Sequence, residues 1–307
     1  MKNITILGAG HFGMVLYDLL SEKNHFPHHI TLIKRGDKIN LATQDFLLVA
    51  LPVKSYNEVF KQISSHQPTL PPTILFSKGM NQMGLLPMAI IQKYFPSAVI
   101  GVLAGPNFAF ELKKKLPTAS VLSSTHPTLI KSGQTLLQQP FWRIYPHPDP
   151  IAVQLNGAMK NVLAIAVGIA HGKNLGLNAT ASLISRGLTE MKKLLLAEKL
   201  AGADNIDENA CYGLSGVGDL ILTTGSNRSR NTALGIKLGQ GIDITSALQS
   251  SDGVAEGYDT SQQIARRAQQ LNIDLPIINT ITAVLHNGLA VDKAIEQLLT
   301  RPLPERE

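Results

Sequence analysis

A glycine pattern near the start of the chain constrains the fold more than any other feature. Gly8-Ala9-Gly10-His11-Phe12-Gly13 follows a short β-branched run at residues 4–7 and precedes an apolar helical pattern at residues 14–20. In such a strand–turn–helix the first glycine permits a tight turn, the second lets a pyrophosphate approach, and the third packs helix on strand. The helix N-terminus then faces the phosphates. The pattern predicts a dinucleotide site; a glycine-rich turn without a ligand is the alternative.

Further apolar runs at residues 30–33, 46–52, 71–76, 98–103, 119–124 and 142–145 are typical of buried strands. Only about a dozen residues separate the first two of these runs, which is short for a helical crossover between parallel strands, so we expect a trimmed or missing helix there. His147-Pro148-Asp149-Pro150 ends the alternation, and helical patterns follow. We therefore expect a doubly wound α/β Rossmann domain over residues 1–150 and an all-α substrate domain over residues 151–307.

Composition limits the partners that this chain can have. Its 307 residues are 44% hydrophobic and 16% charged, which indicates a globular protein. The net charge of +6 suits an anionic ligand, but aromatics are 5% and no basic run exceeds Lys113-Lys114-Lys115, so nucleic acid is not indicated. The single Cys211 excludes an internal disulfide and fits a reducing cytoplasm. We see no signal peptide, membrane span or metal cluster, and a homodimer stays open.

The end of the second predicted strand bears on the choice of cofactor. A site for NAD usually has Asp or Glu there, to bind the ribose 2′-hydroxyl. This chain has Lys34-Arg35 instead, and two cations suit a 2′-phosphate. The sequence therefore favours NADPH over NADH, although Asp37 lies nearby and a solvated basic turn is the alternative.

A second unusual stretch is the apolar helix predicted over residues 156–168, which carries Lys160 and Asn161 in its first turns. Burying a lysine without a partner is costly, so the residue is a candidate for chemistry; a lysine that reaches water from a helix end is the alternative. A lysine can donate a proton to a reacting group when burial or nearby cations lower its pKa toward neutrality.

Polar residues at strand ends and in one later segment complete the candidate site. Lys78 and Gly105 follow predicted strands, and ligands of open α/β sheets bind beyond the carboxyl ends of strands. Residues 213–231 gather glycines, Asp219 and Arg230, with Ser229 and Asn231 beside the arginine. A guanidinium can bind phosphate oxygens in a bidentate manner, with hydroxyl and amide groups adding hydrogen bonds. We expect Asp219 to orient Lys160, and Lys78 to add positive charge near the substrate.

Taken together, these motifs resemble the bacterial NAD(P)-dependent glycerol-3-phosphate dehydrogenases over most of the chain. The motifs in family order are Gly8-Ala9-Gly10-His11-Phe12-Gly13, Ser77-Lys78-Gly79, Gly105-Pro106-Asn107-Phe108-Ala109, Gly157-Ala158-Met159-Lys160-Asn161, Arg186-Gly187-Leu188-Thr189-Glu190-Met191, Gly216-Val217-Gly218-Asp219-Leu220, Ser229-Arg230-Asn231 and Glu256-Gly257. The resemblance implies reversible reduction of dihydroxyacetone phosphate to sn-glycerol 3-phosphate with NADPH or NADH, which supplies glycerol phosphate for phospholipid synthesis.

The resemblance also implies a role for each matching residue. The lysine that matches Lys160 donates and accepts the proton. The residues expected to contact the substrate are Lys78, Gly105, Asn107, Lys160, Asn161, Asp219, Ser229, Arg230 and Asn231. The residues expected at the cofactor, or where it meets the substrate, are Gly8, Gly10, His11, Phe12, Gly13, Arg35, Lys78, Ala109, Arg230, Val254 and Glu256.

The chain departs from the family pattern at three places. The stretch between residues 35 and 46 is shortened, which bears on the adenine-side pocket and the number of strands; Gly176-Leu177-Asn178-Ala179 lacks an acid; and Gln154 replaces a glutamate. A β-hydroxyacid or ketopantoate-type reductase is the nearest alternative function, because Arg230 could also bind a carboxylate. A nucleotide-sensing protein without activity is the alternative of another class.

Overall fold

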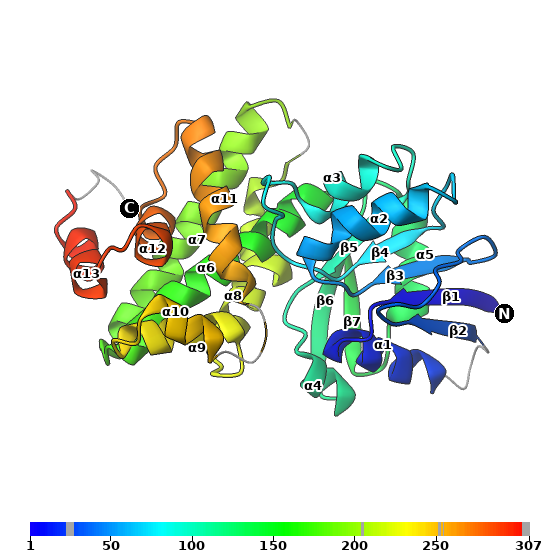
Figure 1. Cartoon of the computed structure of the whole chain (residues 1–307), viewed down its shortest axis with the longest axis horizontal. Coiled ribbons are helices and arrows are strands. Elements are labelled where there is room, and N and C mark those ends of the chain that lie inside the picture. Colours follow the sequence, from blue (N-terminus) through cyan, green and yellow to red (C-terminus); the bar gives the residue numbers. More distant parts are fainter. Residues whose placement is uncertain (23–27, 204–205, 251–252, 254, 303–307) are drawn as a thin grey trace. The chain divides into compact units, whose positions relative to one another are not determined.

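The computed structural model describes residues 1–22, 28–203, 206–250, 253 and 255–302. The chain divides into two compact units (Figure 1). The first contains residues 1–157 and 210–219, and the second contains residues 158–209 and 220–307. Helix α6 (Pro150–Gly172) begins where the sequence predicts the change to helices, and the division between the units falls inside this helix, after Gly157.

The first unit contains a seven-stranded sheet in the order β2-β1-β3-β4-β5-β6-β7. Its strands are β1 (Lys2–Leu7), β2 (His28–Ile33), β3 (Phe46–Val49), β4 (Thr73–Leu75), β5 (Ile100–Ala104), β6 (Thr118–Ser123) and β7 (Trp142–His147). Strands β1 to β5 are parallel, β6 is antiparallel to β5, and β7 is parallel to β6. The predicted α/β sheet domain, followed by helices, is confirmed.

Helices cover both faces of this sheet, because its strands are apolar on both sides. Leu48 and Ile74 point into the core formed with α1 (His11–Ser21), α4 (Ala109–Lys113) and α5 (Pro127–Leu137). Leu47 and Leu75 point into the opposite core, which α2 (Tyr56–Ser64) and α3 (Pro87–Gln92) close. Figure 1 shows α2 and α3 on the face of the sheet opposite α1 and α4. A short 3₁₀ turn, η1 (Val53–Ser55), precedes α2.

The crossover from β2 to β3 contains no helix, and every residue of it, 34–45, is described. The prediction of a trimmed or missing helix is thus confirmed. The crossover contributes Ile39 and Leu41 directly to the core, where the two side chains are 9% and 2% exposed. In the strand order of the sheet, β2 is at one edge.

The second unit is helical. Its helices, besides the later part of α6, are α7 (Gly176–Leu200), α8 (Asp219–Thr224, from Leu220 on), α9 (Arg230–Gly239), α10 (Ile244–Gln249), α11 (Glu256–Gln270), α12 (Pro276–His286) and α13 (Val291–Leu299). Helices α6 and α9 cross at very short distance. A Cβ added to Gly235 would lie 2.2 Å from the Ile165 carbonyl oxygen and 2.8 Å from the Gly168 Cα. Only glycine allows this contact between two backbones.

Helix α6 is the one described helix that is long and apolar enough to cross a membrane. Of the 18-residue stretch of α6 that meets this criterion, 94% is buried inside the protein. This is the property of a core helix, which meets the same test of length and composition as a membrane span.

Candidate functional site

The glycine turn after β1 has the geometry that its pattern predicts. Gly8 has a positive φ of 111°, and its N–H donates to the Ile33 carbonyl oxygen at 3.0 Å. A Cβ on Gly13 would lie 1.9 Å from the Gly8 carbonyl oxygen, so helix α1 packs directly against the turn. Gly10 is the N-cap of α1, has no side-chain cap and has open space where its Cβ would be. The first N–H groups of α1 are therefore available to a phosphate.

The residues around this turn differ in what they offer a cofactor. Phe12 packs on Phe76 with ring centroids 5.3 Å apart and ring planes inclined by 42°, which places apolar side chains beside the turn, while His11 is exposed at the start of α1. Arg35 is exposed just beyond β2. The Asp37 carboxylate accepts a hydrogen bond from the Lys34 N–H at 2.8 Å, so the one acid of this turn is bound to its backbone. Ala109 is the first residue of α4.

Lys78 is the centre of the polar cluster in the first unit. Its Nζ lies 2.5 Å from the Asp219 Oδ2, 3.3 Å from the Gly105 carbonyl oxygen and 3.5 Å from the Asn107 Oδ1. The Lys78 side chain is 17% exposed and the Asp219 side chain 2% exposed. The predicted residues Lys78, Gly105, Asn107 and Asp219 are thus brought together at the carboxyl ends of β4 and β5. A partly buried ammonium with a fixed carboxylate partner is suited to hold negative charge on a ligand.

A late segment of the chain brings Asp219 to this cluster. Residues 210–219 belong to the first unit and include a 3₁₀ turn that begins in the second unit, η2 (Glu208–Tyr212), and a π-helical turn, η3 (Leu214–Gly218). The Asn156 Nδ2 donates to the Ser215 Oγ at 3.2 Å and ties the segment to α6. The Asn156 Oδ1 is buried and has no hydrogen-bond partner among the described residues.

In the second unit, Lys160 is buried with 5% of its surface exposed. Its Nζ donates to the Thr223 Oγ1 at 2.9 Å, and the Thr223 carbonyl oxygen accepts a hydrogen bond from the Thr232 Oγ1 at 2.8 Å. These bonds connect α6, the end of α8 and the first turn of α9. Sequence reasoning missed Thr223; the signal was its position four residues after Asp219, one helical turn along α8.

The start of α9 places the predicted phosphate-binding residues. Ser229 is the N-cap of α9, and its Oγ accepts from the Thr232 N–H at 3.2 Å. Arg230 is exposed, which leaves its guanidinium accessible to an anion. The Asn231 Oδ1 accepts from the Gly257 N–H at 3.0 Å, at the beginning of α11. The first N–H groups of α9 add partial positive charge at the same place.

Helix α11 starts against this group. A Cβ on Gly257 would lie 2.6 Å from the Asn161 carbonyl oxygen, so α6, α9 and α11 meet where Asn161, Asn231 and Gly257 lie. Glu256 is the first residue of α11, and Val254 lies outside the described residues. The second unit therefore brings together Lys160, Asn161, Ser229, Arg230, Asn231 and Glu256, and the orientation of Lys160 by Asp219 stays a prediction.

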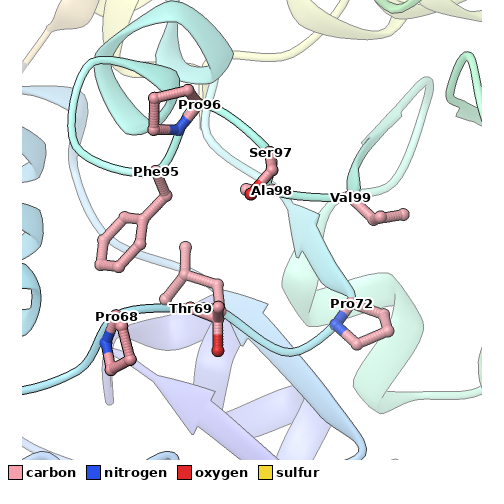
Figure 2. Close-up of a pocket in the computed structure, with 9 residues that line it drawn as sticks. Pro68, Thr69, Pro72, Phe95, Pro96, Ser97, Ala98 and Val99 are labelled. Atoms are coloured by element: carbon pink, nitrogen blue, oxygen red, sulfur yellow. The ribbon is translucent and has the colours of Figure 1, made fainter.

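Two other features have structural explanations. Gln154, which departs from the family pattern, is buried; its Oε1 accepts from the Met88 N–H at 3.0 Å and its Nε2 donates to the Pro150 carbonyl oxygen at 2.9 Å. Figure 2 shows a pocket whose lining includes Pro72 and Val99, which immediately precede β4 and β5. This pocket lies at the amino ends of the strands, whereas the candidate residues follow their carboxyl ends.

A glycine turn open to phosphate at the carboxyl end of a parallel strand, in a sheet domain that is followed by helices with a buried lysine, is typical of a dinucleotide-dependent dehydrogenase. Family models agree: the one described as NAD-dependent glycerol-3-phosphate dehydrogenase N-terminus matches residues 26–130, and its C-terminal counterpart matches residues 149–296. The chain belongs to the NAD(P)-dependent glycerol-3-phosphate dehydrogenase family.

Individual relatives match along nearly the whole chain. A glycerol-3-phosphate dehydrogenase [NAD(P)+] from Trichormus variabilis is 35% identical over 98% of this chain and 97% of its own length. One from Staphylococcus aureus is 33% identical over 98% of both. The crystal structure of the glycerol-3-phosphate dehydrogenase from Coxiella burnetii superposes with a TM-score of 0.85 at 29% identity, covering 98% of this chain and 99% of that one.

Proposed function

We propose that this chain reduces dihydroxyacetone phosphate to sn-glycerol 3-phosphate with NADPH or NADH, reversibly, and that Lys160 is its proton donor. The observation that carries the assignment is a buried lysine whose Nζ donates to Thr223, which in turn accepts a hydrogen bond from the first turn of α9, the helix that begins with Arg230 and Asn231. The enzyme supplies glycerol phosphate for phospholipid synthesis and works in the cytoplasm.

The first unit fits a dinucleotide by two observations on the chain itself: the Gly10 position is open, and the first N–H groups of α1 have no side-chain cap. A dinucleotide held there would supply a hydride for the substrate carbonyl carbon. The carbonyl oxygen gains the electron pair of the broken C=O π bond and takes a proton from the Lys160 ammonium. Thr223 fixes the Lys160 Nζ so that the proton leaves from a defined position.

The substrate phosphate needs a second group of donors. Arg230 offers a fork of N–H groups that matches two phosphate oxygens, and the hydroxyl of Ser229 and the carboxamide of Asn231 lie on either side of it in sequence. The Nζ of Lys78, held by Asp219, adds positive charge for the substrate or the cofactor. Such preorganised donors need no rearrangement when charge develops.

Turnover with a set of ketones tests the assignment. With NADPH, absorbance should fall with dihydroxyacetone phosphate and stay constant with hydroxypyruvate or ketopantoate, the substrates of the alternative reductases. Lys160→Ala should lower the rate by roughly 10²–10⁴-fold and leave NADPH binding nearly intact, because a general acid contributes about that much.

Lys173→Ala is the matched control, because Lys173 lies just beyond α6 and forms a 2.5 Å ion pair with Asp292. This variant should keep wild-type turnover. A Lys160→Ala enzyme within a few-fold of wild type, with an unchanged melting temperature, would remove Lys160 from the chemistry. Binding of NADPH without turnover of any ketone would favour the nucleotide-sensing alternative.

The same site favours NADPH over NADH. Lys34, Arg35 and Asp37 are exposed at the end of β2, and the carboxylate of Asp37, the one acid nearby, accepts a hydrogen bond from the Lys34 N–H. Arg35→Asp should therefore weaken NADPH more than NADH, by about tenfold or more, because a charge reversal removes the partner of the 2′-phosphate. Fluorescence titration of the wild type and of Arg35→Asp with each cofactor measures the dissociation constants. Equal losses for the two would mean that Arg35 does not contact the 2′-phosphate.

A further inference from the structure

We propose that Trp142 is a positioning residue for the Lys78 ammonium, acting through Ser120 and Asn107. The proposal rests on the function given above only in assigning Lys78 to the substrate or cofactor. The indole of Trp142 is 1% exposed, and Trp142 is the single tryptophan of the chain. Its Nε1 donates to the Ser120 Oγ at 2.9 Å, and the Asn107 Nδ2 donates to the same oxygen at 3.2 Å. The Asn107 Oδ1 then faces the Lys78 Nζ at 3.5 Å.

The sheet topology brings these residues together. Because β6 runs antiparallel to β5, its first residues lie beside the carboxyl end of β5, where Ala104 pairs with Val121. The next residues along the two strands, Gly105 and Ser120, are so close that a Cβ on Gly105 would lie 3.1 Å from the Ser120 Cα. The Thr118 hydroxyl donates to the Pro106 carbonyl oxygen and fixes the loop that carries Asn107.

Strand β7 extends the same arrangement by one strand. It runs parallel to β6, with Trp142 paired to Thr118, so its first residue also lies near the carboxyl ends of β4 and β5. The indole can then reach Ser120, two residues further along β6. A bulky side chain at the start of an outer strand is thereby connected to the polar cluster around Lys78.

The chemistry of the two end groups fixes the direction of every hydrogen bond between them. An ammonium and an indole N–H can only donate. Asn107 must therefore turn its Oδ1 toward Lys78 and its Nδ2 toward Ser120, and the Ser120 Oγ accepts from both sides. With the opposite amide orientation, the Nδ2 of Asn107 would face the Lys78 ammonium, donor against donor. The indole N–H holds the Ser120 oxygen in place for this arrangement.

The consequence concerns how Lys78 meets a ligand. Its Nζ has three acceptors, of which Asn107 is the most distant, at 3.5 Å against 2.5 Å for Asp219 and 3.3 Å for Gly105. The weakest of the three hydrogen bonds is therefore the one to Asn107, and a ligand oxygen on that side can most easily accept a hydrogen bond from the Lys78 ammonium. A change in where Asn107 sits changes the donor geometry offered to the ligand, without altering any charge.

The indole N–H resonance tests the hydrogen bonds without reference to activity. A chain with one tryptophan gives one such signal in a ¹H–¹⁵N spectrum. Ser120→Ala should move it strongly, because the acceptor is lost, and Lys78→Met should also move it, through Asn107 and Ser120. The control Lys54→Met changes an exposed lysine of η1 and should not. A signal that is insensitive to Lys78→Met, or equally sensitive to Lys54→Met, would overturn the proposal.

Steady-state kinetics test the positioning role. We expect Trp142→Phe to raise the KM for dihydroxyacetone phosphate by about threefold to tenfold with a smaller loss in kcat, the effect of one neutral hydrogen bond. Trp142→Phe should have no further effect on KM in the Ser120→Ala background, because both act through one oxygen. Ile144→Val, a buried apolar change on β7, should lower the melting temperature and leave KM unchanged.

If the Trp142→Phe and Ser120→Ala substitutions each raise the KM and their effects multiply in the double variant, the two residues act independently. This result, or an unchanged KM in Trp142→Phe, would show that the indole only packs the core. Failure of the wild type to turn over dihydroxyacetone phosphate would contradict the proposed function instead. In that case the resonance experiment still decides whether Trp142 is connected to Lys78.

Discussion

Glu190 should make the stability of the helical unit depend on pH. This glutamate is buried on α7, and its two carboxylate oxygens accept hydrogen bonds from the Ile277 and Ile278 N–H groups, at 2.6 Å and 3.1 Å. They thereby cap helix α12, whose own N-cap, Leu275, has no capping side chain. Burial raises the pKa of Glu190 from 4.5 to about 7, against the two N–H donors, with Asp274 raising it further and Lys193 lowering it.

The direction of the effect follows from this pKa. The folded protein keeps the Glu190 proton up to about pH 7, whereas the unfolded chain releases it near 4.5. The free energy that the folded state gains from the neutral carboxyl is therefore full below pH 4.5 and is lost as the pH rises through 7. At 1.36 kcal/mol for each pKa unit, the loss between about pH 5 and about pH 8 is about 2.5 kcal/mol.

Urea unfolding followed by far-ultraviolet circular dichroism measures this loss. Glu190→Gln removes the titrating group, and the hydrogen bond that it also loses costs the same at every pH. The free energy of unfolding of Glu190→Gln minus that of the wild type should therefore increase by about 2.5 kcal/mol from about pH 5 to about pH 8. Other groups titrate alike in both proteins and cancel.

Glu296→Gln is the control, because the Glu296 carboxylate is 59% exposed and forms a surface pair with Lys293. The free energy of unfolding of Glu296→Gln minus that of the wild type should change by less than about 0.5 kcal/mol over the same pH range. An equally small change for Glu190→Gln would refute the reasoning. It would mean that the two N–H donors at the start of α12 compensate the carboxylate fully for its burial.

Two further predictions concern the second unit. Arg230→Lys keeps the charge but loses the fork, so it should raise the KM for dihydroxyacetone phosphate by at least about tenfold with a smaller loss in kcat; a lower melting temperature with an unchanged KM would make Arg230 a structural residue only. Gly235→Ala should force α9 away from α6, because its Cβ would lie 2.2 Å from the Ile165 carbonyl oxygen. Unfolding in urea should show a loss of at least about 1–3 kcal/mol, and a loss under about 0.5 kcal/mol would mean that the two helices separate without cost.

Much of the α/β unit could be predicted because its signals are local. Each of the seven strands overlaps an apolar run in the sequence, since strands buried on both faces need no polar alternation. The missing helix between β2 and β3 followed from chain length alone. The glycine turn was predictable because the closest contact of Gly13 is with Gly8, five residues earlier, and because Gly8 has a positive φ; the contacts of Gly8 with Ala50 and Leu51 are not local in sequence.

Other parts depend on contacts that no local pattern encodes. Residues 210–219 lie with the α/β unit although helices surround them in the sequence, and so Asp219 pairs with Lys78, 141 positions earlier. Thr223 was missed because threonine is an ordinary residue in a helix, and only the buried Lys160 beside it gives its hydroxyl a role. Lys78 and Lys160 could be identified from the sequence by their residue type and position, whereas their partners, Asp219 and Thr223, are determined by the tertiary structure.

The antiparallel strand β6 explains why the sequence could not identify Trp142 or Ser120. The rule that ligands bind beyond the carboxyl ends of strands directs attention to residues that follow a strand, as Lys78 and Gly105 do. When a strand is reversed, its first residues occupy that edge of the sheet instead. Direction is not visible in an apolar run, because a strand has the same alternation read either way. A sequence interpretation that assumes parallel strands therefore searches the wrong end of β6 and β7, and it takes a tryptophan at the start of β7 for core.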